Sequence, residues 1–146
     1  NDAERTRAAF DAQGYYRSGD LFEIAGDQRQ YYRYVGRLKE IIVRGGFNVS
    51  SAEVENLVAE YPGIKEVGVV GLPDERLGER ICAFIAMRPG CPAPSRESLV
   101  AFLRDELHVA SLKLPEKLIV LDALPRNANT KIDKPMLRTL LAQRPE

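Results

Sequence analysis

The sequence is poor in the residues that build metal centres and disulfide frameworks. Its 146 residues include no tryptophan, one histidine (His108) and two cysteines (Cys82 and Cys91), and the cysteines form no CxxC pair. A structural zinc site needs about four such ligands, and a disulfide framework needs more cysteine pairs. We therefore expect no metal site and two free thiols in a reducing compartment, the cytoplasm. His108 ends a predicted helix, where a surface or dipole-facing role is the ordinary one.

The chain also lacks an excess of either charge and any long apolar run. Lysine and arginine together number 21, as do aspartate and glutamate, so the formal net charge is zero. Nucleic-acid binding needs an excess of basic side chains, and a membrane-spanning helix needs roughly 20 apolar residues. The polar first residues, 1–5, lack the apolar segment of a signal peptide. We expect no nucleic-acid partner, no transmembrane segment and no signal peptide.

What is present is a chain of short alternating elements. Residues 2–13 are charged and rich in alanine, which favours a helical turn or two. The aromatic and β-branched runs 15–24 and 30–35 predict two strands joined by a hairpin turn at 25–27. A polar joint at 36–39 precedes a further strand at 40–44, and we place a domain boundary there.

A helix is predicted to follow directly. Ser50 and Glu53 have the spacing of a capping box, and Val49 and Val54 have that of the hydrophobic staple. Apolar residues then recur at helical spacing until Pro62 ends the pattern. The recurring residues are Val54, Leu57, Val58 and Tyr61.

The rest of the chain predicts strands at 64–71, 80–87 and 117–121, with a helix after Ser95 and another opened by Asp133 and Pro135. The expected fold class is therefore α+β: a small three-stranded sheet with packed helices plus a β-hairpin, preceded by the separate hairpin of the first residues.

Four polar segments are richer in Gly, Arg, Lys and Asp than packing requires: 16–21, 36–39, 44–48 and 124–131. A carboxylate beside a glycine can approach a diol and accept two hydrogen bonds. Arginine and lysine on separate loops can neutralise a phosphate. Taken alone, these features point only weakly to a nucleotide site.

The order of these segments carries more weight. Residues 16–21 match the pattern Y-R-T-G-D-L with Ser18 in place of Thr, and residues 36–46 match G-R-x-[DK]-x-x-I-x-x-x-G, followed by a Glu-Val-Glu helix at 53–55. Residues 124–131 match L-P-[RK]-x-x-x-G-K. Together they resemble the C-terminal third of the adenylate-forming superfamily of acyl- and aryl-CoA synthetases, nonribosomal-peptide adenylation domains and firefly luciferase. The resemblance covers residues 8–142.

The resemblance implies two parts: residues 1–38 as the end of a large N-terminal adenylation domain, and residues 39–146 as the C-terminal lid domain. It implies an acid–thiol ligase of fatty-acid metabolism that uses ATP, CoA and a carboxylic acid. Mg²⁺ would be bound mainly through the large domain, which is the lid's partner. A lid without the phosphate loop and acyl pocket of that domain is expected to be inactive.

The resemblance also assigns roles to single residues. Asp20 would bind the ribose hydroxyls and Arg37 the ribose or phosphate side of the nucleotide, whereas the ordinary alternatives are a turn-capping aspartate and a surface salt bridge. Lys39 would be the hinge about which the lid rotates. Lys131 would be the catalytic residue that stabilises the phosphate charge as acyl-AMP forms. Thr130 replaces the family's usual glycine before it, and Lys134 is expected to be a solvated charge.

Gly45, Gly46 and Asn48 would line the pantetheine tunnel for CoA. The alternative, a tight strand-to-helix turn, also favours glycine and is compatible with the tunnel. Arg44 is a weaker candidate for a CoA phosphate. Two other functions remain open: an adenylation unit that loads a carrier-protein thiol, and a noncatalytic binding module of the same fold.

Overall fold

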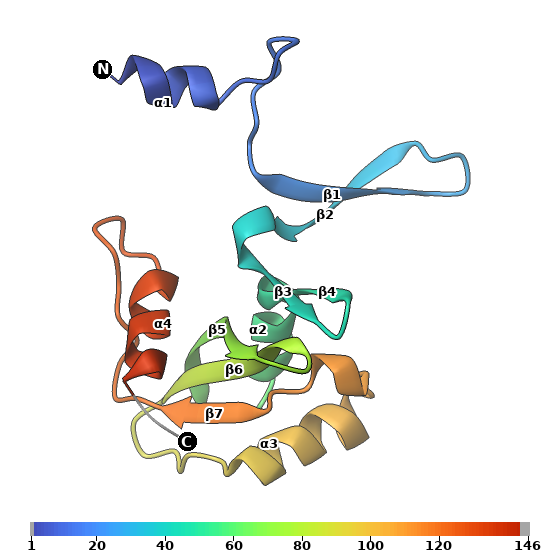
Figure 1. The fold of residues 1–146 in the computed structure, drawn as a ribbon. Helices are drawn as coiled ribbons and strands as arrows, with labels where there is room; N and C mark the ends of the chain where they lie inside the picture. Colours follow the sequence, from blue (N-terminus) through green and yellow to red (C-terminus); the bar gives the residue numbers. More distant parts are fainter. Residues whose placement is uncertain (1, 144–146) are drawn as a thin grey trace. The chain divides into compact units, whose positions relative to one another are not determined.

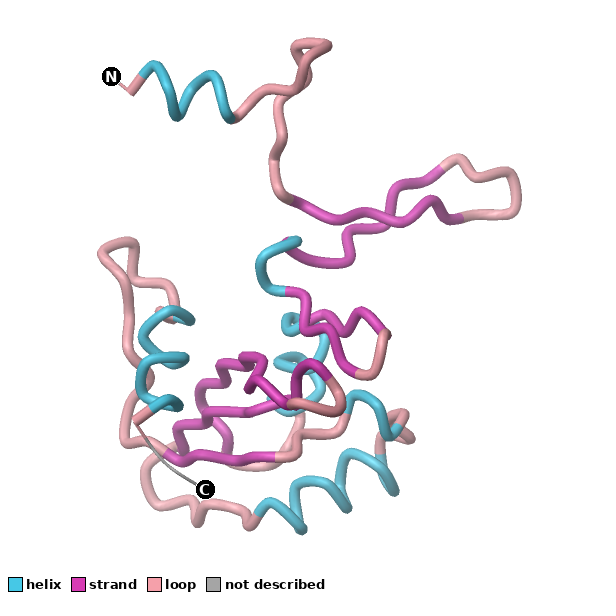
Figure 2. Tube along the Cα trace, viewed as in Figure 1, coloured by secondary structure: helices cyan, strands magenta, loops and turns pink. Residues whose placement is uncertain are grey.

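The computed structural model describes residues 2–143, so the outermost ends of the two predicted domains, residue 1 and residues 144–146, lie outside the described part. The chain divides into two compact units between Lys39 and Glu40. Their elements are traced in Figure 1 and coloured by type in Figure 2.

The first unit holds a short helix and a two-stranded sheet. Helix α1 (Ala3–Ala8) begins where the Asp2 carboxylate accepts from the Arg5 N–H. Strands β1 (Asp20–Ala25) and β2 (Tyr31–Arg37) pair antiparallel, which confirms the predicted hairpin. The first strand begins later than predicted, because the Asp11 carboxylate accepts from the N–H groups of Gln13 and Tyr15 and holds that stretch as a loop.

The second unit is built on a five-stranded sheet. Its strands are β3 (Ile41–Arg44), β4 (Phe47–Ser50), β5 (Ile64–Asp74), β6 (Gly78–Met87) and β7 (Lys117–Val120). The order β4-β3-β6-β5 is antiparallel, and β7 pairs with β6 in parallel. The α+β class is as predicted, but the expected three-stranded sheet and hairpin form one sheet, joined by the pairing of Arg44 with Gly78.

Strand β6 is buried on both faces. Ile81, Ala83 and Ile85 belong to one apolar cluster, whereas Cys82, Phe84 and Ala86 belong to another. Successive side chains of a strand point to opposite faces, so a sheet covered on both sides needs a continuous apolar run such as this one.

Helices cover both faces of the sheet. Helix α2 (Ser51–Ala59) and helix α3 (Arg96–Ala101), which continues as the π-helical turn Phe102–Glu106, contribute apolar residues to the cluster of Ile81. Helix α4 (Lys134–Ala142) contributes Leu137 and Leu141 to the cluster of Phe84. The three predicted helix starts are confirmed, since Ser50, Ser95 and Asp133 each accept from a backbone N–H three residues on.

Helix α4 approaches strand β5 closely at Gly68. A Cβ at this position would lie 2.6 Å from Cδ1 of Leu137 and 3.1 Å from Cγ2 of Ile132. The absence of a side chain at Gly68 therefore sets how near α4, and the loop that leads into it, can lie to the sheet.

Candidate functional site

Asp20 and Arg37 lie opposite each other at the open end of the first unit's hairpin. They are paired residues in the strand register, and the Arg37 Nε lies 2.9 Å from the Asp20 Oδ1. The turn before Asp20 is capped by Ser18, whose hydroxyl accepts from the Asp20 N–H at 3.1 Å. Within residues 2–143 no backbone N–H donates to the Asp20 carboxylate, so Asp20 does not have the turn-capping role considered above. The two residues predicted to bind a nucleotide thus form one charged pair.

Lys39 is the last residue of the first unit. It lies in a single 3₁₀ turn (Leu38–Glu40), and its side chain is exposed. The next residue, Glu40, is held by the second unit through an ion pair with Lys134. Lys39 therefore follows a strand of one unit and directly precedes an anchored residue of the other.

Gly45 and Gly46 form the two-residue loop of a hairpin, since Arg44 pairs with Phe47 across it. Their φ angles are +57° and +82°, which is the left-handed conformation that both central residues of a type I′ turn require. The alternative considered above, a strand-to-helix turn, is therefore wrong: strand β4 intervenes, and Asn48 lies exposed on it. The Gly45 N–H donates to the Leu77 carbonyl at 2.7 Å, which ties the turn to the β5–β6 hairpin.

Arg44 is engaged inside the domain. Its guanidinium donates to both carboxylate oxygens of Glu116, with Nη2 to Oε1 at 2.7 Å, and Glu116 also accepts from the Ile81 N–H. The hydrogen bond to Glu116 raises the pKa of Arg44 above its usual value. A bidentate pair of this kind has a structural role, so Arg44 is a poor candidate for a free phosphate ligand.

Lys131 lies in the loop between β7 and α4 and is exposed. Among the described residues its ammonium group has no partner. Its backbone, in contrast, is held by Asn127: the Lys131 N–H donates to the Asn127 Oδ1 at 3.2 Å, and the Asn127 N–H donates to the Lys131 carbonyl at 2.9 Å. The loop thus holds the backbone of Lys131 in place and leaves its ammonium exposed.

Thr130, the departure from the family pattern, has a φ of +60°. The position therefore adopts the left-handed conformation that glycine would take without cost, and the β-branched threonine occupies it under strain. The Thr130 N–H donates to the Asn127 carbonyl at 2.9 Å.

The expectation for Lys134 was wrong. Its side chain is only 13% exposed, and its ammonium lies 2.8 Å from the Glu55 Oε1, 3.1 Å from the Glu40 Oε2 and 2.8 Å from the Ser51 Oγ. Three acceptors from α2 and the start of the unit therefore surround it. Only tertiary structure brings them together, since Glu40 is 94 residues away in sequence.

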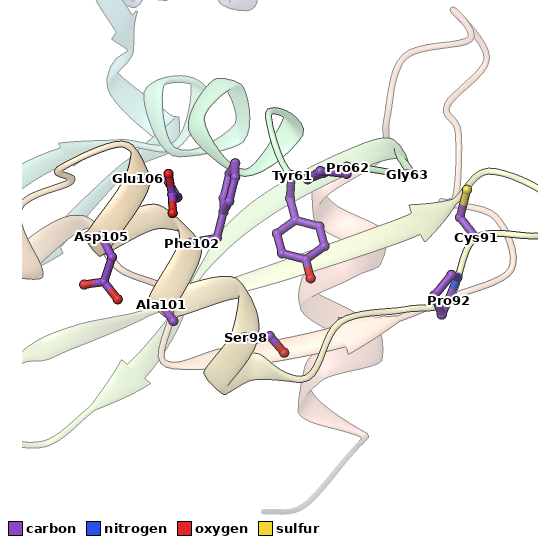
Figure 3. Close-up of a pocket in the computed structure, with 10 residues that line it drawn as sticks. All are labelled: Tyr61, Pro62, Gly63, Cys91, Pro92, Ser98, Ala101, Phe102, Asp105 and Glu106. Carbon is purple, nitrogen blue, oxygen red and sulfur yellow. The ribbon is translucent and has the colours of Figure 1, made fainter.

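A pocket of about 580 Å³ lies elsewhere on the second unit (Figure 3). Tyr61 and Phe102 line it with ring centroids 5.2 Å apart in an edge-to-face arrangement, and Cys91 lies at one end. None of the predicted site residues lines it, and its Asp105 is already paired with Arg104. The pocket is separate from the candidate site.

The remaining sulfur and imidazole groups are those of Cys82, Cys91 and His108. No group of three His, Cys, Asp or Glu side chains comes together anywhere in residues 2–143. Both cysteines are free: burial raises the pKa of the Cys82 thiol to about 12, whereas Cys91 is exposed. In the same part of the chain, no helix has the length and apolarity to cross a membrane.

Comparisons with known proteins by sequence and by structure find the same kind of enzyme. A model of the AMP-binding enzyme C-terminal domain matches residues 53–131. The chain is 42% identical over 144 residues to the medium-chain fatty-acid–CoA ligase of Escherichia coli, covering 99% of this chain and 25% of that protein. It is 41% identical over 139 residues to a salicylyl-CoA synthase / salicylate adenylyltransferase of a Streptomyces species, covering 95% and 24%.

Among solved structures, the chain resembles ATP-bound MatB from Rhodopseudomonas palustris, with a TM-score of 0.78 and 33% identity over 94% of this chain and 26% of that one. The chain therefore spans about a quarter of the length of the curated relatives it matches.

Proposed function

Because this chain belongs to the family of AMP-binding enzyme C-terminal domains, we propose that it is the C-terminal part of an ATP-dependent acyl-CoA ligase. The whole protein would activate a carboxylic acid as acyl-AMP and transfer the acyl group to CoA. The observation that carries the proposal is the exposed ammonium of Lys131, which has no partner among the described residues and lies on a loop held by hydrogen bonds. The chain that carries it is similar to a fatty-acid–CoA ligase along 99% of its length.

In the first half-reaction, a carboxylate oxygen of the substrate attacks the α-phosphorus of ATP, and the bond to the leaving pyrophosphate breaks. Negative charge on the phosphate oxygens must be stabilised as this happens. Lys131 would supply a positive charge that no described carboxylate neutralises beforehand. The Asp20 carboxylate would accept hydrogen bonds from the two ribose hydroxyls. Arg37, which is paired with Asp20, would contact the ribose or phosphate side of the nucleotide.

In the second half-reaction, the thiolate of CoA attacks the acyl carbon and AMP leaves. The β3–β4 turn of Gly45 and Gly46, with the exposed Asn48 after it, would line the passage for pantetheine. This turn and the loop between β7 and α4 lie apart on the second unit (Figure 1). A rotation of the unit about Lys39 between the half-reactions would let each serve the same centre in turn.

Features of the first unit support a larger protein around it. The hairpin exposes large apolar side chains along both strands, and an uncovered surface of this kind marks a contact with another part of a protein. The side chains are Phe22, Ile24, Tyr31, Tyr32 and Tyr34. The large N-terminal domain would cover them and supply the phosphate loop, the acyl pocket and most of the ligands for Mg²⁺. We place the enzyme in the cytoplasm, with its ATP and CoA.

The proposal is tested by carboxylate-dependent ATP–pyrophosphate exchange with the full-length protein over a panel of fatty and aryl acids. Acids that support exchange are then incubated with ATP and CoA, and the thioester is measured. Exchange together with acyl-CoA is the expected result. Exchange with acyl transfer to a phosphopantetheinyl carrier protein but not to CoA would favour the carrier-loading function. Absence of exchange with every acid would favour a noncatalytic binding module.

A further inference from the structure

The peptide bond that leads into Lys131 is held at both ends. Its N–H, which belongs to Lys131, donates to the Asn127 Oδ1 at 3.2 Å. Its carbonyl, which belongs to Thr130, accepts from the Arg126 Nη1 at 2.5 Å. An isolated backbone bridge between Arg126 and Ile132 closes the loop around these contacts. The plane of this peptide, and with it the direction in which the Lys131 side chain leaves the backbone, is therefore set by two side chains of the same loop.

Arg126 is itself fixed by the sheet. Its Nη2 donates to the Glu66 Oε1 at 2.6 Å, and the Glu66 side chain is only 15% exposed. The other oxygen of Glu66 lies 3.4 Å from the N–H of Leu124, at the start of the loop. The hydrogen bond from Arg126 lowers the pKa of Glu66, so this carboxylate stays charged. Strand β5, which carries Glu66, pairs with β6 from Ile64 to Asp74, with a register irregularity between Ile64 and Glu66.

The guanidinium suits this bridge because it presents several donors in one rigid plane. One arm reaches a main-chain carbonyl of the loop and the other reaches a carboxylate of the sheet. Thr130 adds a reason for the brace, since its left-handed conformation is strained for a β-branched residue and persists only when its surroundings hold it.

We propose that Arg126 and Glu66 are positioning residues for Lys131, which transmit the rigidity of the sheet to the loop that carries the catalytic ammonium. The proposal rests on the function proposed above. Neither residue needs to touch ATP or the carboxylate substrate. Their effect follows from geometry, because a misplacement of about 1 Å can cost on the order of 100-fold in rate.

The test compares Arg126→Met, Arg126→Lys and Glu66→Gln in the full-length protein, with both half-reactions measured separately. We expect Arg126→Met to lower ATP–pyrophosphate exchange by about 10- to 100-fold while thioester formation from supplied acyl-AMP stays within about twofold. Arg126→Lys keeps the charge but cannot bridge both acceptors at once, so it should recover part of the loss. Glu66→Gln preserves shape and an acceptor oxygen, and should give a smaller loss in the same half-reaction.

Arg104→Met is the matched control, because Arg104 forms an exposed ion pair with its neighbour Asp105 and no contact with the loop. It should leave both half-reactions unchanged. A double variant, Arg126→Met with Glu66→Gln, should lose no more exchange than Arg126→Met alone, since both changes break one connection.

Unchanged exchange in Arg126→Met, or an equal loss in both half-reactions, would overturn the proposal. If Arg126→Met does not fold, the two half-reactions of Glu66→Gln are compared instead. Unchanged exchange in this variant, or an equal loss in both half-reactions, would then overturn the proposal. Lys131→Ala is run in parallel: retention of exchange by this variant would refute the role of Lys131 and the positioning proposal with it. Loss of exchange in Lys131→Ala but not in Arg126→Met would refute the positioning role alone.

Discussion

The ammonium of Lys134 lies 2.8 Å from the Glu55 Oε1 and so joins helix α4 to helix α2. The same ammonium pairs with Glu40, the residue next to Lys39. Glu55 in turn accepts from the Val69 N–H at 2.8 Å. One mostly buried cation thus connects α4, α2, β5 and the start of the second unit, so its removal tests how this unit is held together.

Lys134→Met should lower the free energy of unfolding of the 146-residue chain by about 3 kcal/mol, because it leaves two partly buried carboxylates without their cation. Urea unfolding followed by circular dichroism measures the change. The matched control is Lys113→Met, which removes the more exposed pair with Glu53 and should cost about 0.5 kcal/mol. Equal decreases in the free energy of unfolding for the two variants would show that burial of the Lys134 ion pairs adds nothing to stability.

Lys131→Ala in the full-length enzyme should reduce ATP–pyrophosphate exchange by about 100- to 1000-fold, the cost of losing one charge aimed at a transition state. Thioester formation from pre-made acyl-AMP should be largely spared. Exchange and single-turnover thioester assays measure the two steps. An equal fall in both would contradict the assignment of Lys131 to the first step.

Asp20→Ala should raise the KM for ATP by about 10- to 100-fold, because two hydrogen bonds to the ribose are lost. It should also reduce the preference for ATP over 2′-deoxyATP, which a role confined to holding Arg37 would not do. Initial rates with both nucleotides measure the effect. Glu23→Gln, in an exposed ion pair with Arg33 on the same hairpin, is the control and should behave as the parent enzyme.

Gly46→Ala should lower the free energy of unfolding by about 1 kcal/mol, because alanine is disfavoured at the φ of +82° that Gly46 adopts. A Cβ at this position would meet nothing within 4 Å, so no steric cost is added. Gly46→Asn tolerates the left-handed conformation better and yet adds a larger side chain. If the turn lines the CoA passage, Gly46→Asn slows thioester formation and leaves pyrophosphate exchange intact. If the turn is only structural, both half-reactions keep the parental rates.

Native protein at pH 8 should incorporate one equivalent of iodoacetamide, at Cys91. Cys82 is buried and its pKa of about 12 leaves a thiolate fraction on the order of 10⁻⁴ at that pH. Mass spectrometry of the modified peptides identifies the site, and urea-unfolded protein, in which both thiols react, is the control. Rapid modification of Cys82 in the native state would show that this face of the sheet opens readily.

Much of the architecture followed from local patterns. The capping residues Ser50, Ser95 and Asp133 predicted the three helix starts of the second unit, because a cap is a contact between residues close in sequence. Strand β4 was missed: its first two residues are exposed and follow two glycines, so neither burial nor alternation marked Phe47–Ser50 as a strand. The turn became recognisable only from the pairing of Arg44 with Phe47.

The order of the motifs identified the candidate site residues, and their roles remain predictions. These residues are Asp20, Arg37, Lys39, Lys131 and the glycine turn. The partners of these residues were beyond sequence reasoning. No spacing indicates that Arg126 meets Glu66, 60 residues away, or that Lys134 meets Glu40. Lys134 was expected to be a solvated charge because the family resemblance gives it no role.

The sequence by itself determined the family, the α+β class and the positions at which the chemistry is proposed, because these depend on residue types at short, ordered spacings. Tertiary structure alone decided which charges are free to act. Arg44 and Lys134 are held by carboxylates that are distant in sequence, whereas the Lys131 ammonium has no partner among the described residues. The physical reason is that ion pairing depends on distance in space, and folding sets that distance.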